Sequence, residues 1–299
     1  MKFCAKCGRR VDSTICQYCG YHLDKTFISF KIRQSNKKLF YIILAGIGII
    51  FVSYGIVSAT LDPYGIFYDK GDFVLYYYSA DDPRYKQIED FFYNSEYFDR
   101  HVSSLNDQYK LPYDVNVSLQ ECNVANAFYD EATKDLVICY ELIDIFIEIL
   151  YPHSDTDEEL ISQLEDVIYW VFLHELGHVF IDVYNLPLLG GSEEAADQLA
   201  TIVILKQGPK GVTALESVTI TLIETSSAET PINTLEYWDI HSFNLQRYYD
   251  ILCFIYGKDP SQYTYLVGEW LPQDRATTCE SEYNKISSSW DEVLAPYRK

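Results

Sequence analysis

The hydrophobic and polar positions in the second part of the chain alternate in ways that predict a small β-sheet. Residues 73–78, FVLYYY, form an aromatic and aliphatic run typical of a buried strand. Val115, Val117 and Leu119 alternate with polar neighbours, which is the period of a half-buried strand. Residues 126–140 contain two β-prone runs around a polar turn, and this pattern predicts a hairpin.

Apolar residues with helical spacing fill most of the remaining sequence. The longest such stretch, 157–184, has acidic residues in its first turn, where they favour the positive end of the helix dipole. We expect further helices at 84–109, 141–150, 192–206, 212–224 and 242–257. Together these elements predict an α+β domain over residues 62–299, with a small sheet beside its helices.

One segment is apolar throughout. Residues 39–61 contain no charged side chain and are long enough, as a helix, to cross a hydrocarbon layer about 30 Å thick. A buried core helix is the alternative, but such helices seldom run this long without a polar face. Basic residues precede the segment and acidic residues follow it, so we expect a single-pass cell-membrane protein with a cytoplasmic N-terminus and an extracytoplasmic domain at 62–299.

Composition and charge narrow the class of protein. The chain has 299 residues, of which 48% are hydrophobic, and a formal charge of −21, which together indicate a folded, acidic protein. Residues 1–38 contain nine Lys or Arg against two Asp, including a basic juxtamembrane segment at 25–38. An acidic main domain makes nucleic acid an unexpected partner, because phosphate binding depends on clustered Lys and Arg.

The first four cysteines form two CxxC pairs, Cys4 with Cys7 and Cys16 with Cys19, each followed by glycine. Four thiolates at this spacing close a tetrahedral zinc site, whereas two disulfides are disfavoured in a reducing cytoplasm. Residues 1–24 resemble a short zinc ribbon of the kind found at the N-terminus of many bacterial membrane proteins. We expect one structural zinc ion there, with a role in stability or in binding a cytoplasmic protein partner.

The other four cysteines, Cys122, Cys139, Cys253 and Cys279, are scattered singly through the predicted exported domain. Their even number permits disulfides outside the cytoplasm. We favour pairing within the first two and within the last two. Four cysteines allow three connectivities, however, and free buried thiols are a further alternative.

The motif HELGH supplies the candidate chemistry. His174 and His178 lie four positions apart, so on a helix their imidazoles point the same way and can reach one zinc ion. Glu175 is rotated by about 100° from His174, where it can act on water as a general base. The alternative is a pair of core histidines, which is disfavoured because an apolar helix makes unpaired polar groups costly.

A catalytic zinc ion needs a third protein ligand. The metzincin pattern is excluded, because Tyr184 stands where its third histidine would be and Met1 is the only methionine. Glu193 is the next candidate, and Asp197, one turn later, could bind the far nitrogen of a histidine ligand. This arrangement resembles that of the gluzincin metallopeptidases. An acidic first helical turn would explain Glu193 and Glu194 equally well.

Seven stretches give a more specific resemblance, and they cover roughly residues 72–299. In order, they are LNDQYKLP, ECNVANAFYD, VICYEL, HELGH, EEAADQLA, HSFNLQRYYDILCFIYG and LPQDRATTC. They resemble the motifs of a family of bacterial zinc metallopeptidases named for an expected activity and filed as a domain of unknown function. The resemblance implies a zincin-like fold, a catalytic zinc ion and a peptide or protein substrate, and it treats the four later cysteines as family features.

A peptidase also needs a donor for the developing oxyanion. We predict His241, oriented by Asp239, with Arg247 and Tyr248 as alternatives. By analogy with gluzincins, residues 126–129 are the expected docking strand for substrate.

Two other functional classes compete with this reading. A site-2-type intramembrane protease also uses HExxH, but it needs an aspartate ligand in the following loop, and none stands between 185 and 191. The non-enzymatic alternative is an anchored sensor or scaffold with a structural metal site. The presence of Glu175 disfavours it, because a structural site has no need of a base.

Overall fold

The computed structural model describes residues 2–3, 10–11, 68–188, 190–227 and 244–299. The chain divides into two compact units, Met1–Pro63 and Tyr64–Lys299. In the first unit, β1 (Lys2–Phe3) pairs antiparallel with β2 (Arg10–Val11).

The predicted ribbon cysteines and the predicted membrane span at 39–61 lie outside the described residues. Within the described ranges, no helix is both long and apolar enough to cross a membrane.

The second unit contains a four-stranded sheet in the order β3-β4-β6-β5. Its strands are β3 (Phe73–Tyr77), β4 (Val115–Gln120), β5 (Ala127–Asp130) and β6 (Asp135–Cys139). The first three strands in that order run parallel, and β5 pairs antiparallel with β6 as the second arm of the predicted hairpin. Strand β5 is therefore at one edge of the sheet.

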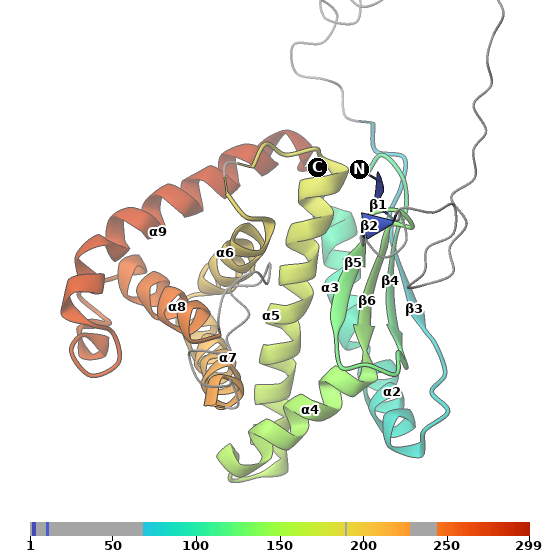
Figure 1. Ribbon diagram of the computed structural model, residues 1–299, viewed down its shortest axis with the longest axis horizontal. Coiled ribbons are helices and arrows are strands. Elements are labelled where there is room, and N and C mark those ends of the chain that lie inside the picture. The colour runs from blue at the N-terminus through green and yellow to red at the C-terminus, as the bar shows by residue number, and fades with distance from the viewer. Residues whose placement is uncertain (1, 4–9, 12–67, 189, 228–243) are drawn as a thin grey trace, which may run out of the picture. The chain divides into compact units, whose positions relative to one another are not determined.

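Helices make up most of the second unit, and the mixed α+β prediction is confirmed. They are α2 (Pro83–Ser95), α3 (Tyr97–Gln108), α4 (Tyr140–Leu150), α5 (Asp157–Val183), α6 (Ser192–Leu205), α7 (Pro209–Ser227), α8 (Asn244–Lys258) and α9 (Gln273–Leu294), with short 3-10 turns at Tyr151–His153, Thr264–Leu266 and Ala295–Tyr297. Helix α5 runs through the middle, with the sheet on one side and α6 to α9 on the other (Figure 1).

The predicted helix at 84–109 is two helices rather than one. Glu96 has a φ of 51°, in the left-handed region, and ends α2 one residue before α3 begins. No glycine or proline marks this break in the sequence. The reason is tertiary packing, because the turn lets Phe92 and Phe98 meet with ring centroids 5.3 Å apart in the core.

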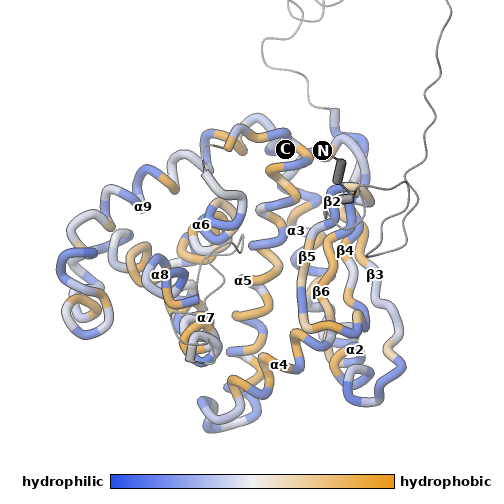
Figure 2. The backbone as a smooth tube through the Cα atoms, viewed as in Figure 1, coloured by the Kyte–Doolittle hydropathy of each residue, from blue (hydrophilic) through white to orange (hydrophobic). Residues whose placement is uncertain are grey.

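Helix α9 was not among the predicted elements. It has 22 residues, but only Ala276, Cys279, Trp290 and Leu294 are buried. Most of its residues are coloured as hydrophilic in Figure 2, in contrast to those of α5. A helix with so few apolar positions gives a weak periodic signal, and its formation depends on the surface it packs against.

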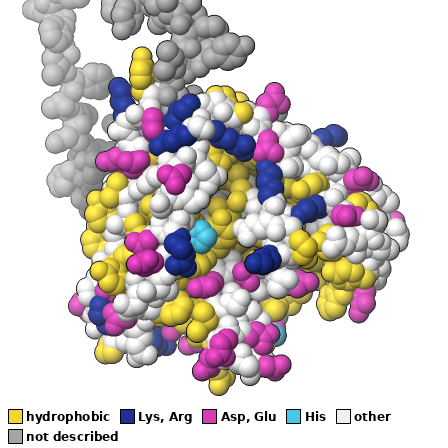
Figure 3. All heavy atoms as spheres, turned by 180° about the vertical axis from the view of Figure 1, so that it is seen from behind, with side chains coloured by type: hydrophobic (Ala, Val, Ile, Leu, Met, Phe, Trp, Pro, Cys, Tyr) yellow, Lys and Arg dark blue, Asp and Glu magenta, His cyan; other side chains and the backbone are white. Residues whose placement is uncertain are grey.

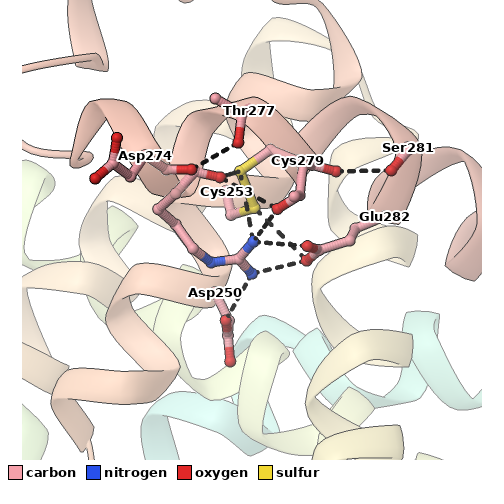
Figure 4. A network of polar contacts seen from close by, with 9 residues as sticks. Asp250, Cys253, Asp274, Thr277, Cys279, Ser281 and Glu282 are labelled. Carbon is pink, nitrogen blue, oxygen red and sulfur yellow. Dashed lines mark hydrogen bonds and ion pairs between the residues drawn. A yellow bond between two sulfur atoms is a disulfide. The ribbon is translucent and has the colours of Figure 1, made fainter.

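Two disulfides have the favoured pairing, Cys122 with Cys139 and Cys253 with Cys279. The second joins α8 to α9, and a network of charged side chains surrounds it (Figure 4). There Arg275 binds Asp250 of α8 at 3.1 Å and Glu282 of α9 at 2.8 Å. These contacts hold α8 in place through α9.

His101 of α3 lies among the aromatic rings of Tyr97, Tyr169 and Phe172. The face in Figure 3 carries hydrophobic side chains among charged ones, and part of it is hollowed. One hollow, of about 110 Å³, is lined by His101 and Tyr169 together with residues of α3, α5 and α6. The His101 ring stacks on Tyr169 with centroids 4.3 Å apart, and burial, aided by the charge of Arg100, lowers the pKa of His101 from 6.5 to about 4.

This histidine makes the stability of the fold depend on pH. The unfolded chain binds a proton at His101 below pH 6.5, whereas the folded chain does so only near pH 4, so stability falls as the pH drops through this window. We expect protonation of His101 to lower the free energy of unfolding by about 2 kcal/mol between pH 7 and pH 4.5, a value reduced to allow for the exposed part of the ring. Urea unfolding measures the free energy of unfolding at pH 7 and at pH 4.5. The difference between the two values should be smaller for His101→Phe than for the unchanged chain. Equal differences would contradict the assignment.

Candidate metal centre

The second half of α5 carries the HExxH residues inside the domain. Thr156 precedes the first residue of the helix, and its side chain accepts a hydrogen bond from the backbone N–H of Glu159. From Leu164 onward most residues of the helix are buried. His174 is 6% exposed and Glu175 is 7% exposed. Polar side chains this deep need partners, since an unpaired buried polar group is costly.

Helix α6 supplies those partners because it approaches α5 closely. A Cβ atom at Gly177 would lie only 2.7 Å from the Cα of Ala196, so this contact requires glycine in the HELGH motif. The chain turns back between the two helices, and Glu193 falls in the first turn of α6. It is buried there, facing the two histidines.

Three side-chain groups converge on one point. The Nε2 atoms of His174 and His178 are 3.3 Å apart. The carboxylate of Glu193 lies 3.3 Å from Nε2 of His174 and 3.4 Å from Nε2 of His178. Ligand atoms about 2.0–2.1 Å from a tetrahedral zinc ion are about 3.3 Å from one another. Oε2 of Glu193 is the oxygen near His174 and Oε1 is the oxygen near His178, so the carboxylate faces both nitrogens at the spacing of ligands around one zinc ion.

Asp197 fixes the orientation of the first histidine. Its Oδ1 lies 2.7 Å from Nδ1 of His174, so this nitrogen carries the proton and donates it. Nε2 then presents its lone pair toward His178 and Glu193. Asp197 is itself held by Arg247 of α8, whose Nε and Nη2 atoms are each 2.8 Å from the carboxylate. The guanidinium of Arg247 also lies over the Trp170 ring. This chain of contacts is the outer support that metal-bound histidines require.

The electrostatics of the cluster favour a positive charge at its centre. Burial alone would lower the pKa of His174, but the hydrogen bonds to Asp197 and Glu193 outweigh it and raise this pKa to about 9. Burial alone would raise the pKa of Glu193, yet the two histidines hold it well below its usual range. Asp197 also has a lowered pKa, because His174 and Arg247 outweigh its burial. A site that stabilises an added proton so strongly also favours a cation in its place.

Arg247→Lys is expected to weaken metal binding by about 10-fold to 100-fold, the range for loss of an outer partner. Lysine keeps the charge but cannot bind Asp197 through two parallel hydrogen bonds. A competition titration of the full chain with a chromophoric chelator measures the effect. Arg275→Lys is the matched control, because that guanidinium binds Asp250 and Glu282 instead. An unchanged metal affinity for Arg247→Lys would contradict the role of Arg247.

A cavity of about 210 Å³ opens beside His174 and Glu175. Asn126 and Ala127, at the start of β5, form part of its wall, and the rest comes from α4, α5, α7 and α8. The predicted docking strand at 126–129 therefore corresponds to the sheet edge at Ala127–Asp130, close to the two HExxH residues.

The predicted site residues have different outcomes. The structure brings together His174, His178 and Glu193, and it places Asp197 on the far nitrogen of His174. His241 and Asp239 lie outside the described residues. Arg247 was predicted only as an alternative oxyanion donor, but its guanidinium is directed to Asp197.

Tyr248, the other alternative donor, is 5% exposed and packs against Tyr249, and it is not part of the cavity wall.

The largely buried His–His–Glu cluster contains an oriented histidine, and the cavity beside it also contains a glutamate. This combination makes metal-dependent hydrolases the candidate class. The chain belongs to the DUF4344 family, whose description is "Putative metallopeptidase", and the family model matches residues 77–294. That match includes all described residues of the cluster. Searches of curated proteins and of solved structures found no match to the chain.

Proposed function

We propose that this protein is a zinc-dependent metallopeptidase in which His174, His178 and Glu193 hold the catalytic ion. The proposal rests on the distances of 3.3–3.4 Å between the two Nε2 atoms and from each of them to an oxygen of the Glu193 carboxylate. Two imidazoles and one carboxylate are a donor set that zinc accepts, and three protein ligands leave a fourth position for water or substrate. Membership of a metallopeptidase family supports the same conclusion.

When bound, zinc supplies a Lewis acid that polarises the scissile carbonyl and lowers the pKa of a bound water towards about 7. Glu175 accepts a proton from the attacking water as its oxygen bonds to the carbonyl carbon. It then delivers that proton to the nitrogen as the C–N bond breaks, which releases an amine and a carboxylic acid. Asp197 and Arg247 keep His174 in the tautomer that faces the ion. His241 is our proposed donor to the developing oxyanion.

The edge of the sheet provides a place for the substrate backbone. Strand β5 pairs with β6 on one side, so an extended peptide can add to its other side through main-chain hydrogen bonds. The first residue of β5, Ala127, shares the cavity wall with His174 and Glu175. A peptide on this edge would pass the proposed base.

We further propose that residues 39–61 anchor the protein in the cell membrane, with the ribbon cytoplasmic and the peptidase domain outside. The support is the charge distribution around the apolar segment and the two CxxC pairs, Cys4/Cys7 and Cys16/Cys19. The two disulfides favour an oxidising compartment for the domain. A cytoplasmic protein partner and a second, structural zinc ion are part of this proposal. An inactive anchored sensor is disfavoured, because it would have no use for Glu175.

Removal of zinc is expected to abolish peptide cleavage by the full chain, and zinc alone should restore it. Elemental analysis should give two zinc ions per chain, one of them lost with activity on brief chelation, because a site closed by four thiolates is harder to strip than an open one. The measurement is cleavage of a quenched fluorescent peptide mixture before chelation, after it and after zinc addition. Full activity in the metal-free chain would contradict the proposal.

A further inference from the structure

The cavity beside His174 and Glu175 is lined in large part by side chains that take no part in the proposed reaction. Apolar side chains form most of them, and they come from three helices: Leu142 and Phe146 of α4, Val167, Trp170 and Val171 of α5, and Leu222 of α7. Val167 and Leu222 are buried, whereas Leu142 and Phe146 are half-buried. The cavity thus continues from the candidate catalytic residues into an apolar interior.

Three polar side chains of the wall, Thr221, Thr225 and Asn244, are hydrogen-bonded to neighbouring groups of the protein. The hydroxyl of Thr221 donates to the Val218 carbonyl at 2.8 Å, and that of Thr225 donates to the Thr221 carbonyl at 2.6 Å. The amide of Asn244 donates to the hydroxyl oxygen of Thr225 at 3.1 Å. Because these donors are directed into the protein, they add little polarity to the cavity.

The charged groups at the cavity also make it unsuited to a charged substrate side chain. Arg247 is held in two hydrogen bonds to Asp197, so it is poorly placed to pair with an acidic side chain. Glu175 would repel an acidic guest, and a basic guest would compete for the carboxylate that must accept a proton. A charged side chain would also lose its hydration among the apolar walls.

The size of the cavity matches one side chain. A volume of about 210 Å³ is somewhat larger than the ~150 Å³ apolar cavity that holds a benzene ring, and smaller than the ~300 Å³ at which pockets for whole small molecules begin. A leucine or phenylalanine side chain fits this range, and an alanine side chain would leave most of the space unfilled.

We propose that this cavity, which we call the α4–α7 pocket, receives a bulky apolar side chain next to the scissile bond and so selects peptides with leucine or phenylalanine at that position. The inference rests on the proposed function, because the pocket is defined by its position beside Glu175. It assigns a substrate class to the site and a specificity role to Leu142 and Phe146.

The test uses the full chain and capped hexa-alanine peptides in which the third alanine is replaced by Leu, Phe, Trp, Asp or Lys. Mass spectrometry identifies the bond that is cut. We expect the Leu and Phe peptides to be cut at a bond flanking the replaced residue, with kcat/KM about 10-fold to 200-fold above that of the all-alanine peptide, the range for filling an apolar pocket. The Asp and Lys peptides should be cut more slowly than the Phe peptide.

Two pocket variants should change this preference in opposite directions. Phe146→Ala enlarges the pocket and should shift the preferred residue from Phe to Trp. Leu142→Phe fills it and should shift the preference toward Ala. Ile147→Ala is the matched control, because Ile147 is half-buried on the same helix but lines a different hollow, with Ile88 and Phe91. Circular dichroism melting would identify a variant that fails to fold, and the remaining variant still tests the pocket.

Failure of the pocket inference can be told apart from failure of the proposed function. Calorimetric binding of the same peptides to Glu175→Gln requires no cleavage. Tighter binding of the Phe peptide, weakened at least 10-fold by Leu142→Phe in that background, would support the pocket even if the unchanged chain cuts nothing. Equal binding of the Phe, Ala and Asp peptides, or a preference that neither pocket variant alters, would overturn it.

Discussion

Glu175→Gln is expected to reduce kcat for peptide cleavage by about 10²-fold to 10⁴-fold, the usual contribution of a general base. Glutamine has nearly the same shape but cannot accept the proton of the attacking water. The three proposed ligand side chains, His174, His178 and Glu193, are unchanged in this variant, so its zinc content should equal that of the unchanged chain. Initial rates on a single peptide and elemental analysis of the same sample measure both quantities.

Glu158→Gln is the matched control for this substitution. Glu158 is exposed in the first turn of α5, so the same chemical change occurs on the same helix far from the cluster. It should leave the rate unchanged. If Glu175→Gln and the unchanged chain cleave peptides equally fast, the peptidase assignment of this site is wrong, and the sensor alternative gains support.

Glu193→Ala is expected to lower zinc affinity by more than the roughly 100-fold seen when an outer partner of a ligand is removed. The variant keeps two histidines facing each other at 3.3 Å but loses the carboxylate that balances the charge of the ion. Activity should fall with zinc occupancy and recover only partly at high zinc concentration. Equilibrium dialysis against a zinc buffer gives the affinity directly.

Glu194→Ala provides the comparison for that result. Glu194 is the next residue on α6, but it is exposed, and it lines hollows on the side of α9. Both variants remove one negative charge from the same helical turn, so a general electrostatic effect would change zinc affinity similarly in the two. Equal affinities would show that Glu193 is not a ligand.

Much of the fold could be predicted, because its local patterns are strong. The strand at 73–77 follows from a continuous apolar run, the strand at 115–120 from alternation of apolar and polar residues, and the long helix at 157–183 from a sustained helical pattern with acidic residues in its first turn. The break at Glu96 could not be predicted, because a left-handed residue other than glycine is selected by packing around it. Helix α9 was missed for a related reason, since its few buried residues act through contacts with α8 rather than through a periodic stripe.

In the candidate site, too, contacts between residues close in sequence could be predicted, and contacts between residues far apart in sequence could not. The approach of His174 and His178 follows from one helical turn, and Glu193 and Asp197 share a face of the next helix. The bond from Arg247 to Asp197 joins residues 50 positions apart in sequence, and no pattern in the chain indicates it. The walls of the α4–α7 pocket likewise come from helices that meet only in the folded domain.

The metal cluster and the outer walls of the α4–α7 pocket come from different helices, although α5 contributes to both. All three groups that face the proposed ion come from α5 and α6, whereas Leu142, Phe146 and Leu222 belong to α4 and α7. Mutations in the α4 and α7 walls are therefore expected to change which peptides are preferred without altering how the ion is held. In this arrangement, homologues can differ in the class of peptide that they prefer while they keep the same metal site.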